Sequence, residues 1–460
     1  MSEHEEDLAE RDEDEYALDT EVVDAIVDAV QAGDTATVDE LMEPLHAADI
    51  ADLLEQISSA ERVALVKLWS KGIDGEILSE LDESIREEVI EALPHDVLSE
   101  AVRELDSDDV VDLLEDLEEP VQERILGALP ESDRAAVEQS LTYPEYSAGR
   151  LMQREVVTAA EHWTVGEAID FLRNAKELPD QFYHMILVDP RWHPTAYVTL
   201  GKLLSSKRAV KLRDIAEDSF RTIDVMEEEG DVAYAFNQYH LISAPVVDAD
   251  GRLVGVITID DAMAVLDEEH EEDILRLAGV GEGSLSDSVV ETTKQRLPWL
   301  AVNLVTAILA SIVIAQFEGV IAQIVALAVL MPIVASMGGN AGTQALTVAV
   351  RAIATRDLTG SNMWRVVRRE AMVGLVNGVV FALVMGLVGW FWFGSTLIGV
   401  VLAAAMVVNL VVAGLAGILV PVTLEKVGVD PALASGAFVT TVTDVVGFFA
   451  FLGLAATVLL

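Results

Sequence analysis

Asp444 is the residue in this chain whose surroundings say most about its chemistry. It is an acidic residue within an otherwise apolar run from Pro431 to Leu460. A carboxylate is costly to leave in hydrocarbon, so a charge at that depth usually faces the interior of a helical bundle or an ion path. Twelve charged residues occur from Leu297 onward, and the other eleven are expected in loops or at helix ends. The alternative is a carboxylate that is hydrogen-bonded inside the bundle and has no role in transport.

A second polar group lies in the segment Met331–Ala354, which contains Pro332 and several glycines. Asn340 and Gln344 are four residues apart, so they share one helical face and can offer amide oxygens. We expect the helix to be broken in this segment, because a break within a membrane is tolerated where it is buried or lines a wet cavity. Helix packing through small residues, with amide hydrogen bonds between helices, explains the same pattern equally well.

Catalysis within the apolar half is disfavoured by what that half lacks. All eight histidines precede residue 297 and the chain has no cysteine, so no zinc-protease motif can form there. A membrane aspartyl protease needs two carboxylates, and each chain has only Asp444 at depth. We therefore do not expect an enzyme, and transport is the best use of this charge.

Composition divides the chain in two. Residues 297–460 contain six basic and six acidic residues, so residues 1–296 hold the whole formal charge of −50. Such acidity keeps a protein hydrated where salt screens self-repulsion, and indicates a salt-adapted source. Nucleic acid is an unfavourable partner because its phosphates would be repelled, whereas multivalent cations are favoured. The acidic N-terminal tail, residues 1–19, is expected to be disordered and is not a signal peptide.

The apolar half contains enough long hydrophobic segments for a polytopic membrane domain. A helix needs about 20 apolar residues to span a bilayer. The five segments that qualify are 297–317, 319–350, 371–393, 396–422 and 432–459. Five arginines between residues 351 and 369 place the loop after the second segment in the cytoplasm. The acidic half is then cytoplasmic, and Leu460 lies outside the cell membrane.

The acidic half contains a repeat and two modules of mixed structure. Apolar residues recur every twelve positions from Leu45 to Leu141, which predicts a solenoid of short helices that are stable only when stacked. Residues 146–270 contain strand-like runs followed by helices, as in Ile242–Leu266, and read as two tandem α/β modules. Residues 267–293 are predicted to form a helical connector into the first span.

Two clusters of carboxylates stand out from the acidic background as candidate cation sensors. The first, in the solenoid, places Asp108 and Asp112 on one helical face. The second surrounds the start of the connector. Like charges at this spacing repel unless a cation lies between them, although a solvated, salt-adapted surface explains any single residue. The complete set of sensor candidates is Asp108, Asp109, Asp112, Asp260, Asp261, Glu268, Glu269, Glu271 and Glu272.

The order of these parts resembles the MgtE-type magnesium transporters. The resemblance covers the chain after about residue 20. It is carried most specifically by PIVASMGGNAGTQ (332–344) and by DPALASGAFVTTVTDVVGFFAFLGLA (430–455). PVVDADGRLVGVIT (245–258) and EEDILRLAGV (271–280) resemble the family's CBS and plug regions. HPTAYVTLGKLL (193–204) departs from the usual CBS pattern.

The resemblance implies a multidomain fold. It would comprise an α-helical solenoid N domain (20–145), tandem α/β CBS domains (146–266, divided into 146–215 and 216–266), a plug helix (267–296) and an all-α membrane domain with five transmembrane helices (297–460).

The resemblance also implies a homodimer in the lipid bilayer, with a Mg²⁺ pore on the two-fold axis lined by the second and fifth spans. Asp444 matches the family's pore aspartate, and Thr440, one turn earlier, would offer a backbone carbonyl to the ion. Gly436 stands where some members have Asn, so one side-chain ligand would be absent. The candidates for lining the pore are Asn340, Gln344 and Gly436. Cytosolic Mg²⁺ bound at the acidic clusters would close the pore.

The alternative function is a CBS-regulated transporter of another divalent cation or of an anion. An anion is disfavoured by Asp444 and by the absence of a cationic ligand within the membrane. The sequence does not decide selectivity among Mg²⁺, Mn²⁺ and Co²⁺, or coupling to H⁺ or Na⁺. No motif decides whether the CBS pair binds an adenine nucleotide.

Overall fold

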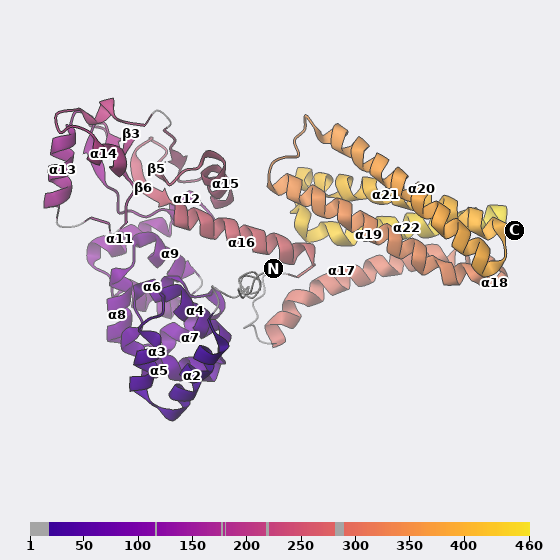
Figure 1. The fold of residues 1–460 in the computed structure, drawn as a ribbon, viewed down its shortest axis with the longest axis horizontal. Helices are drawn as coiled ribbons and strands as arrows, with labels where there is room; N and C mark the ends of the chain where they lie inside the picture. Colours follow the sequence, from indigo (N-terminus) through magenta and orange to yellow (C-terminus); the bar gives the residue numbers. More distant parts are fainter. Residues whose placement is uncertain (1–17, 116, 176–177, 180, 218–219, 281–288) are drawn as a thin grey trace, which may run out of the picture. The chain divides into compact units, whose positions relative to one another are not determined.

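The computed structural model describes residues 18–460 apart from 116, 176–177, 180, 218–219 and 281–288. It divides into two compact units, Met1–Glu269 and His270–Leu460. The predicted tail (1–19) and the second half of the predicted connector therefore lie largely outside the described residues. Figure 1 shows both units and labels many of their helices and strands.

The first unit begins with a stack of short helices. Several of the residues that recur every twelve positions cap the C-terminus of a helix, as Ile57, Leu93 and Leu105 do. The apolar face of each helix is buried against its neighbours in one continuous core. The predicted helical solenoid is confirmed. Its helices are α2 (Thr20–Ala32), α3 (Thr35–Met42), α4 (Ala47–Gln56), α5 (Ser59–Leu68), α6 (Gly75–Ser79), α7 (Glu83–Ala92), α8 (His95–Glu104), α9 (Ser107–Glu115), α10 (Glu119–Leu126) and α11 (Glu131–Ser140), with a 3₁₀ turn at Ser70–Gly72.

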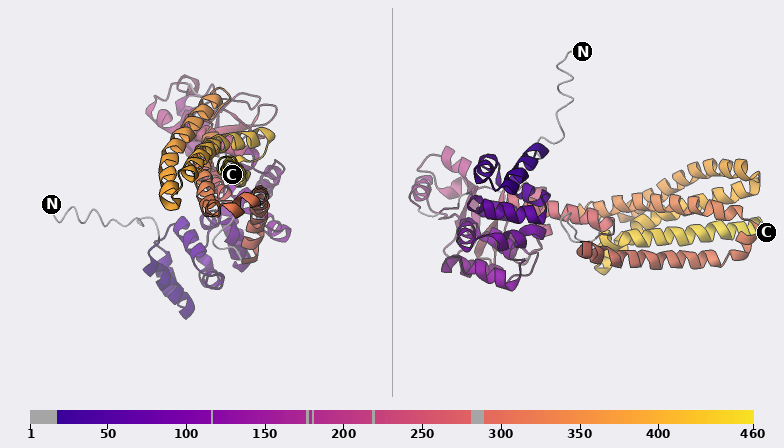
Figure 2. Two further views of the ribbon diagram at one scale, coloured as in Figure 1. Left: turned by 90° about the vertical axis from the view of Figure 1, so that its right-hand side faces the viewer. Right: turned by 90° about the horizontal axis from the view of Figure 1, so that it is seen from below.

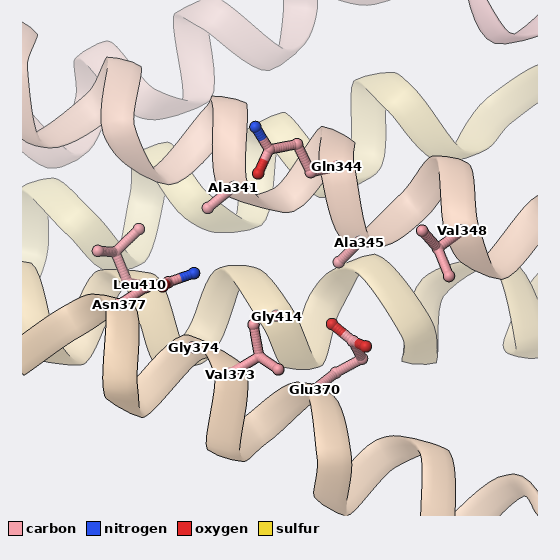
Figure 3. A pocket seen from close by; sticks show the side chains of 10 residues that line it. All are labelled: Ala341, Gln344, Ala345, Val348, Glu370, Val373, Gly374, Asn377, Leu410 and Gly414. Atoms are coloured by element: carbon pink, nitrogen blue, oxygen red, sulfur yellow. The ribbon is translucent and has the colours of Figure 1, made fainter.

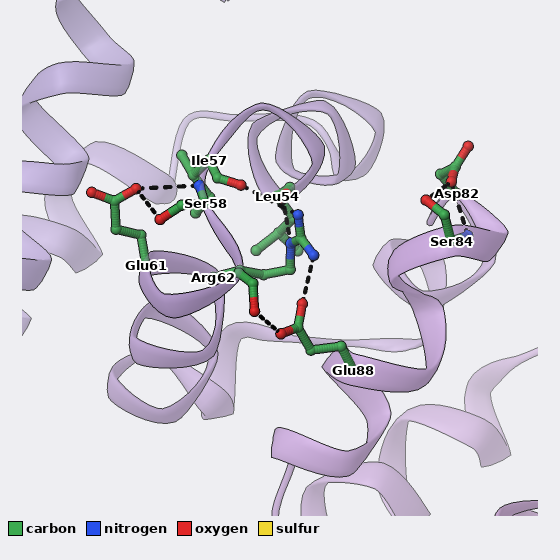
Figure 4. A network of polar contacts seen from close by, with 9 residues as sticks. Leu54, Ile57, Ser58, Glu61, Arg62, Asp82, Ser84 and Glu88 are labelled. Carbon is green, nitrogen blue, oxygen red and sulfur yellow. Dashed lines mark hydrogen bonds and ion pairs between the residues drawn. The ribbon is translucent and has the colours of Figure 1, made fainter. Parts of the chain in front are cut away.

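Buried polar side chains tie successive repeats together (Figure 4). Arg62 is 6% exposed; its Nε donates to the carbonyl oxygen of Leu54 at 2.7 Å, and its Nη1 lies 2.5 Å from Glu88. Arg86, two repeats later, pairs with Asp112 at 2.9 Å. These groups satisfy carbonyls at helix C-termini that have no partner within their own helix. The repeats therefore share these arginine hydrogen bonds to backbone carbonyls as well as their apolar spacing.

The two α/β modules each contain a three-stranded sheet. In both sheets the first strand is parallel to the second and the second is antiparallel to the third. The first module contains β1 (Thr158–Ala160), α13 (Val165–Asn174), β2 (His184–Val188), β3 (Pro194–Thr199) and α14 (Leu200–Ser205). The second contains β4 (Ile223–Asp224), α15 (Glu229–Tyr239), β5 (Ser243–Val247), β6 (Leu253–Thr258) and the start of α16 (Ile259–Leu277).

Two details of these modules were not visible in the sequence pattern. The short helix α12 (Ala148–Leu151) precedes β1, yet Ala148 and Met152 pack in the core of the second module. The last helix of that module and the first part of the connector are one continuous helix, α16, which starts where Thr258 bonds to Asp261. One helix therefore contains residues of both the second module and the connector.

The second unit contains the five apolar helices expected of a membrane domain. The described residues include five helices that are long and apolar enough to cross a membrane. Figure 2 shows them running alongside one another. They are α17 (Val289–Ala315), α19 (Ala326–Ala354), α20 (Met363–Phe393), α21 (Thr396–Val427) and α22 (Pro431–Val458), and a short helix α18 (Glu318–Gln323) lies between the first two.

The predicted break within Met331–Ala354 is wrong. α19 is continuous through Pro332 and its glycines, and the chain is interrupted earlier, at Ile324 and Val325. The glycines serve packing instead. A Cβ on Gly342 would lie 2.7 Å from Val439 of α22, and one on Gly417 of α21 would lie 2.8 Å from the Gly342 carbonyl oxygen. Small residues therefore let α19, α21 and α22 approach closely.

Candidate ion pathway and cation-sensing clusters

Asp444 lies at the middle of α22 and is partly buried within the single chain. No residue that the structure describes forms an ion pair with its carboxylate, and no hydrogen bond to it is made there. Within the described residues, nothing therefore supports the alternative in which the Asp444 carboxylate is hydrogen-bonded inside the bundle. A partly buried carboxylate without a protein partner attracts cations.

The residues one and two turns before Asp444 make hydrogen bonds within their own helix. The Thr440 hydroxyl donates to the Gly436 carbonyl oxygen at 2.9 Å, and the Thr440 carbonyl oxygen accepts a hydrogen bond from Thr443 at 2.9 Å. Because α22 is continuous, the Thr440 carbonyl oxygen also accepts the helical N–H of residue 444, and its role as an ion ligand stays a prediction. Asn340 and Gln344 on α19 are both exposed in the single chain.

Asn409 on α21 is a polar residue that the sequence analysis missed. It is fully buried, and its Nδ2 donates to the Val334 carbonyl oxygen of α19 at 2.8 Å. A Cβ on Gly447 of α22 would lie 2.8 Å from the same amide, and Gly338 of α19 also lies against it. One amide is thereby clamped between the two helices assigned to the pore. The available signal was a single Asn in the apolar run 396–422.

Glu370 corrects the expectation that every charge except Asp444 lies in a loop or at a helix end. It is seven residues inside α20, so about 10 Å from the helix start at a rise of 1.5 Å per residue. Its side chain lines a cavity between α19, α20 and α21 together with Gln344 and Asn377 (Figure 3).

In the first unit, carboxylates from the solenoid and from the second α/β module converge. Asp108 is 8% exposed, and burial together with repulsion from Asp261 raises its pKa well above the ordinary value. Burial, followed by the charge of Asp261, raises the pKa of Asp109 to about 7. Burial raises the pKa of Asp261 itself to about 6. Asp106, which was not predicted, adds to the repulsion at all three. We call Asp106, Asp108, Asp109 and Asp261 the interdomain acidic cluster.

Hydrogen bonds beside the interdomain acidic cluster hold the solenoid against the α/β modules. The Ser107 hydroxyl donates to Glu155 at 2.8 Å, and Arg150 pairs with Glu115 at 2.7 Å. Two predicted members of the sensor lie outside the cluster. Asp112 pairs with Arg86, although its charge still adds to the repulsion at Asp109, and Asp260 is exposed.

The connector end of α16 packs within the second unit. Leu277 packs against an apolar cluster formed by residues of α19, α21 and α22. Arg276 pairs with Glu272 at 2.7 Å and with Asp430, the N-cap of α22, at 3.1 Å. Burial and the charge of Asp430 raise the pKa of Asp273. Glu272 is therefore in an ion-pair network, and Arg276, Asp273 and Asp430 are additional members that the sequence analysis did not select.

The remaining predicted sensor residues, Glu268, Glu269 and Glu271, follow Asp261 along α16. Glu269 approaches Gly230 of α15, and the other two are exposed. Within the described ranges, no three His, Asp or Glu side chains are arranged so that they could hold a metal ion directly. The acidic groups therefore concentrate negative charge without forming a complete inner coordination shell.

Comparison with known proteins connects these elements to a family. Residues 45–146 match the MgtE intracellular N domain, 212–268 match a CBS domain, and 331–454 match the MgtE divalent cation transporter domain. The magnesium transporter MgtE of Thermus thermophilus is 32% identical over 442 residues, which cover 95% of this chain and 98% of that one. The chain belongs to the MgtE family. The MgtE of Bacillus subtilis is 27% identical over 95% of this chain and 97% of its own.

Among solved structures, the chain is similar to the cytosolic domain of the Mg²⁺ channel MgtE in complex with ATP. The similarity has 30% identity and a TM-score of 0.49, and covers 53% of this chain and 99% of that one. The family membership and the multidomain fold expected from the sequence are confirmed: a helical N domain, a CBS pair and a helical C-terminal region with five apolar helices.

Proposed function

We propose that the chain is a Mg²⁺ channel or transporter that works as a homodimer, with the pore on its two-fold axis and Asp444 of each chain facing the ion. The observation that carries the proposal is the carboxylate of Asp444, partly buried in a spanning helix and without a described partner. Two such carboxylates across an axis supply the charge that a dication needs. Relatives named magnesium transporters, similar over almost the whole chain, favour Mg²⁺ as the cargo.

The chemistry of Mg²⁺ agrees with this sparse set of ligands. Mg²⁺ gives up its waters reluctantly and is usually held by one or two carboxylates with several waters retained. A pore with one carboxylate per chain, and the Thr440 carbonyl one turn away, attracts a hydrated ion without binding it too tightly to leave. Gly436, without a side chain, leaves room for the ion's waters.

We further propose that cytosolic Mg²⁺ closes the pore through the interdomain acidic cluster and the connector. The cluster brings carboxylates of two domains together at the start of α16, and the far end of the same helix packs against an apolar cluster formed by residues of α19, α21 and α22. A hydrated Mg²⁺ needs no complete set of protein ligands, so it can neutralise a cluster that lacks an inner coordination shell. Binding favours the closed arrangement by its differential affinity for that arrangement.

The proposed orientation places the first unit and the loop with Arg356 in the cytoplasm and Leu460 outside. It is based on five arginines around this loop: Arg351 at the end of α19, Arg356 in the loop, and Arg365, Arg368 and Arg369 in the first two turns of α20. Binding of an adenine nucleotide by the CBS pair is a separate hypothesis. It is tested by titrating the purified protein with ATP and following heat release.

Uptake into proteoliposomes tests the transport proposal. Mg²⁺, Mn²⁺, Co²⁺, Ca²⁺ and Na⁺ are compared side by side for the wild type, Asp444→Asn and the control Glu425→Gln. Glu425 is an exposed carboxylate near the end of α21. We expect Mg²⁺ uptake in the wild type and the control, and none in Asp444→Asn, with the dimer intact by size-exclusion chromatography. Normal uptake by Asp444→Asn would refute the pore assignment, and uptake of an anion instead would refute the function.

A further inference from the structure

A cavity of about 180 Å³ lies between α19, α20 and α21, and Asp444 is not among the residues that line it. Its walls are mostly small and apolar, with Val348, Val373 and Leu410 among them. Three polar side chains interrupt these walls: Gln344 from α19, and Glu370 and Asn377 from α20. In Figure 3, Gln344 lies on one side of the cavity, and Asn377 and Glu370 lie on the other.

None of the three polar side chains forms a hydrogen bond or an ion pair with another residue in the described part of the chain. Arg368 and Arg369 are close to Glu370 in sequence, yet neither pairs with it. Polar groups at membrane depth normally find protein partners, because no bulk water is available to them. Three such groups around one cavity therefore indicate a solute that supplies the missing interactions.

The side chains define the chemistry of that solute. One carboxylate and two amide oxygens are hard oxygen ligands, and the cavity lacks the sulfur and imidazole ligands that soft metals prefer. A water molecule occupies about 30 Å³ of liquid, so the cavity admits an ion with several waters. We propose that Gln344, which the sequence analysis placed among the pore-lining candidates, instead forms with Glu370 and Asn377 a second cation site for a hydrated hard cation, Na⁺ or Mg²⁺.

The location of the cavity favours exchange with the cytoplasmic side. Glu370 is about 10 Å and Asn377 about 21 Å from the start of α20, the end next to the arginine-rich loop. Close packing fixes the far wall, since a Cβ on Gly374 would lie 2.5 Å from the Leu410 carbonyl oxygen and one on Gly414 would lie 2.8 Å from that of Glu370. The wall between α20 and α21 is thus fixed by close backbone packing.

Carbodiimide labelling of the full-length protein tests the site without relying on transport. Dicyclohexylcarbodiimide reacts with carboxyl groups in apolar surroundings, and peptide mass spectrometry reports its addition at Glu370. The experiment uses the Asp444→Asn background, in which an ion in the pore cannot contribute. Each sample contains Mg²⁺, Na⁺ or tetramethylammonium at one ionic strength. Mass action predicts labelling about tenfold slower when the cation is at ten times its dissociation constant.

We expect Na⁺ or Mg²⁺ to protect Glu370, while labelling at Glu318 and Glu425 stays unchanged. The cation that protects at the lower concentration identifies the occupant. Gln344→Leu combined with Asn377→Leu should abolish protection while Glu370 is still labelled. Three results would each overturn the proposal: no protection by either ion, equal protection by tetramethylammonium, or full protection in the double variant. Protection from labelling is measured without transport, so a negative result would refute the second cation site and leave the pore assignment unaffected.

Discussion

Neutralising Asp109 should stabilise the first unit at alkaline pH and remove much of its pH dependence. In the folded chain the pKa of Asp109 is raised to about 7 by burial and by the charge of Asp261. In the unfolded chain it should return to about 3.9. Between these values the folded state binds more protons than the unfolded state. The free energy of unfolding therefore falls as the pH rises from about 4 to about 7.

The expected size of this effect follows from the two pKa values. A carboxyl group that titrates near 7 when folded and near 3.9 when unfolded lowers the free energy of unfolding by about 2 to 3 kcal/mol between pH 5 and pH 8. Asp109→Asn removes that contribution, so the variant should be more stable than the wild type at pH 8. Near pH 5, where Asp109 is largely protonated in the folded chain, the two proteins should differ much less.

Magnesium should act in the opposite direction to alkaline pH. If Mg²⁺ binds the folded wild type with a dissociation constant of about 1 mM, 10 mM Mg²⁺ stabilises it by about 1.4 kcal/mol. With one carboxylate removed, Asp109→Asn should gain less. Mg²⁺ therefore gives the wild type part of the stability that Asp109→Asn already has without the ion.

The assay is urea unfolding of a fragment ending at Leu277, followed by tryptophan fluorescence at pH 5 and pH 8, with and without Mg²⁺ at constant ionic strength. Glu91→Gln is the matched control, because Glu91 is an exposed carboxylate on α7. If Asp109→Asn loses as much stability as the wild type between pH 5 and pH 8, the charge of Asp109 does not destabilise the folded interdomain acidic cluster. If the response to Mg²⁺ is also unchanged, the sensor lies elsewhere.

Three further predictions concern the second unit and the topology. Arg276→Gln should weaken the attachment of α16 to α22 and leave a larger Mg²⁺ flux at high cytosolic Mg²⁺, whereas the control Arg252→Gln should not; equal inhibition in both variants would count against the attachment. Asn409→Leu should lower the stability of the detergent-solubilised protein by about 1 to 3 kcal/mol, because it removes the hydrogen bond to the Val334 carbonyl oxygen and overpacks the helix crossing; an unchanged melting temperature would contradict the clamp. A cysteine at Arg356 should react with impermeant reagents only from the cytoplasmic side, and one added after Leu460 only from outside; the reverse labelling would invert the proposed topology.

Sequence patterns alone predicted the elements of this protein whose causes are local. Five apolar segments predicted five long helices, because crossing a bilayer depends on the length and hydropathy of each segment. A twelve-residue apolar period predicted the solenoid, because each short helix must bury the same face. Asp444 was recognisable because a charge within an apolar segment is anomalous wherever the segment packs.

Tertiary structure decided which polar groups meet. Asp108 and Asp261 are far apart in the chain, and only the docking of the solenoid on the second α/β module brings their charges together. Asp112, one helical turn from Asp108, instead pairs with Arg86 of an earlier repeat. The helical period places residues on a face but does not say what that face contacts.

The same distinction applies within the membrane domain. Pro332 and the glycines of α19 suggested a broken helix, but packing against α21 and α22 keeps the helix continuous. Asn409 and Glu370 looked ordinary in their own segments, one as an isolated amide and the other as a helix-end charge. The contacts of Asn409 involve residues of three helices, and the cavity beside Glu370 is also lined by residues of three helices. Hydropathy predicts that a helix lies in the bilayer, but the partners of its polar side chains depend on how the helices cross.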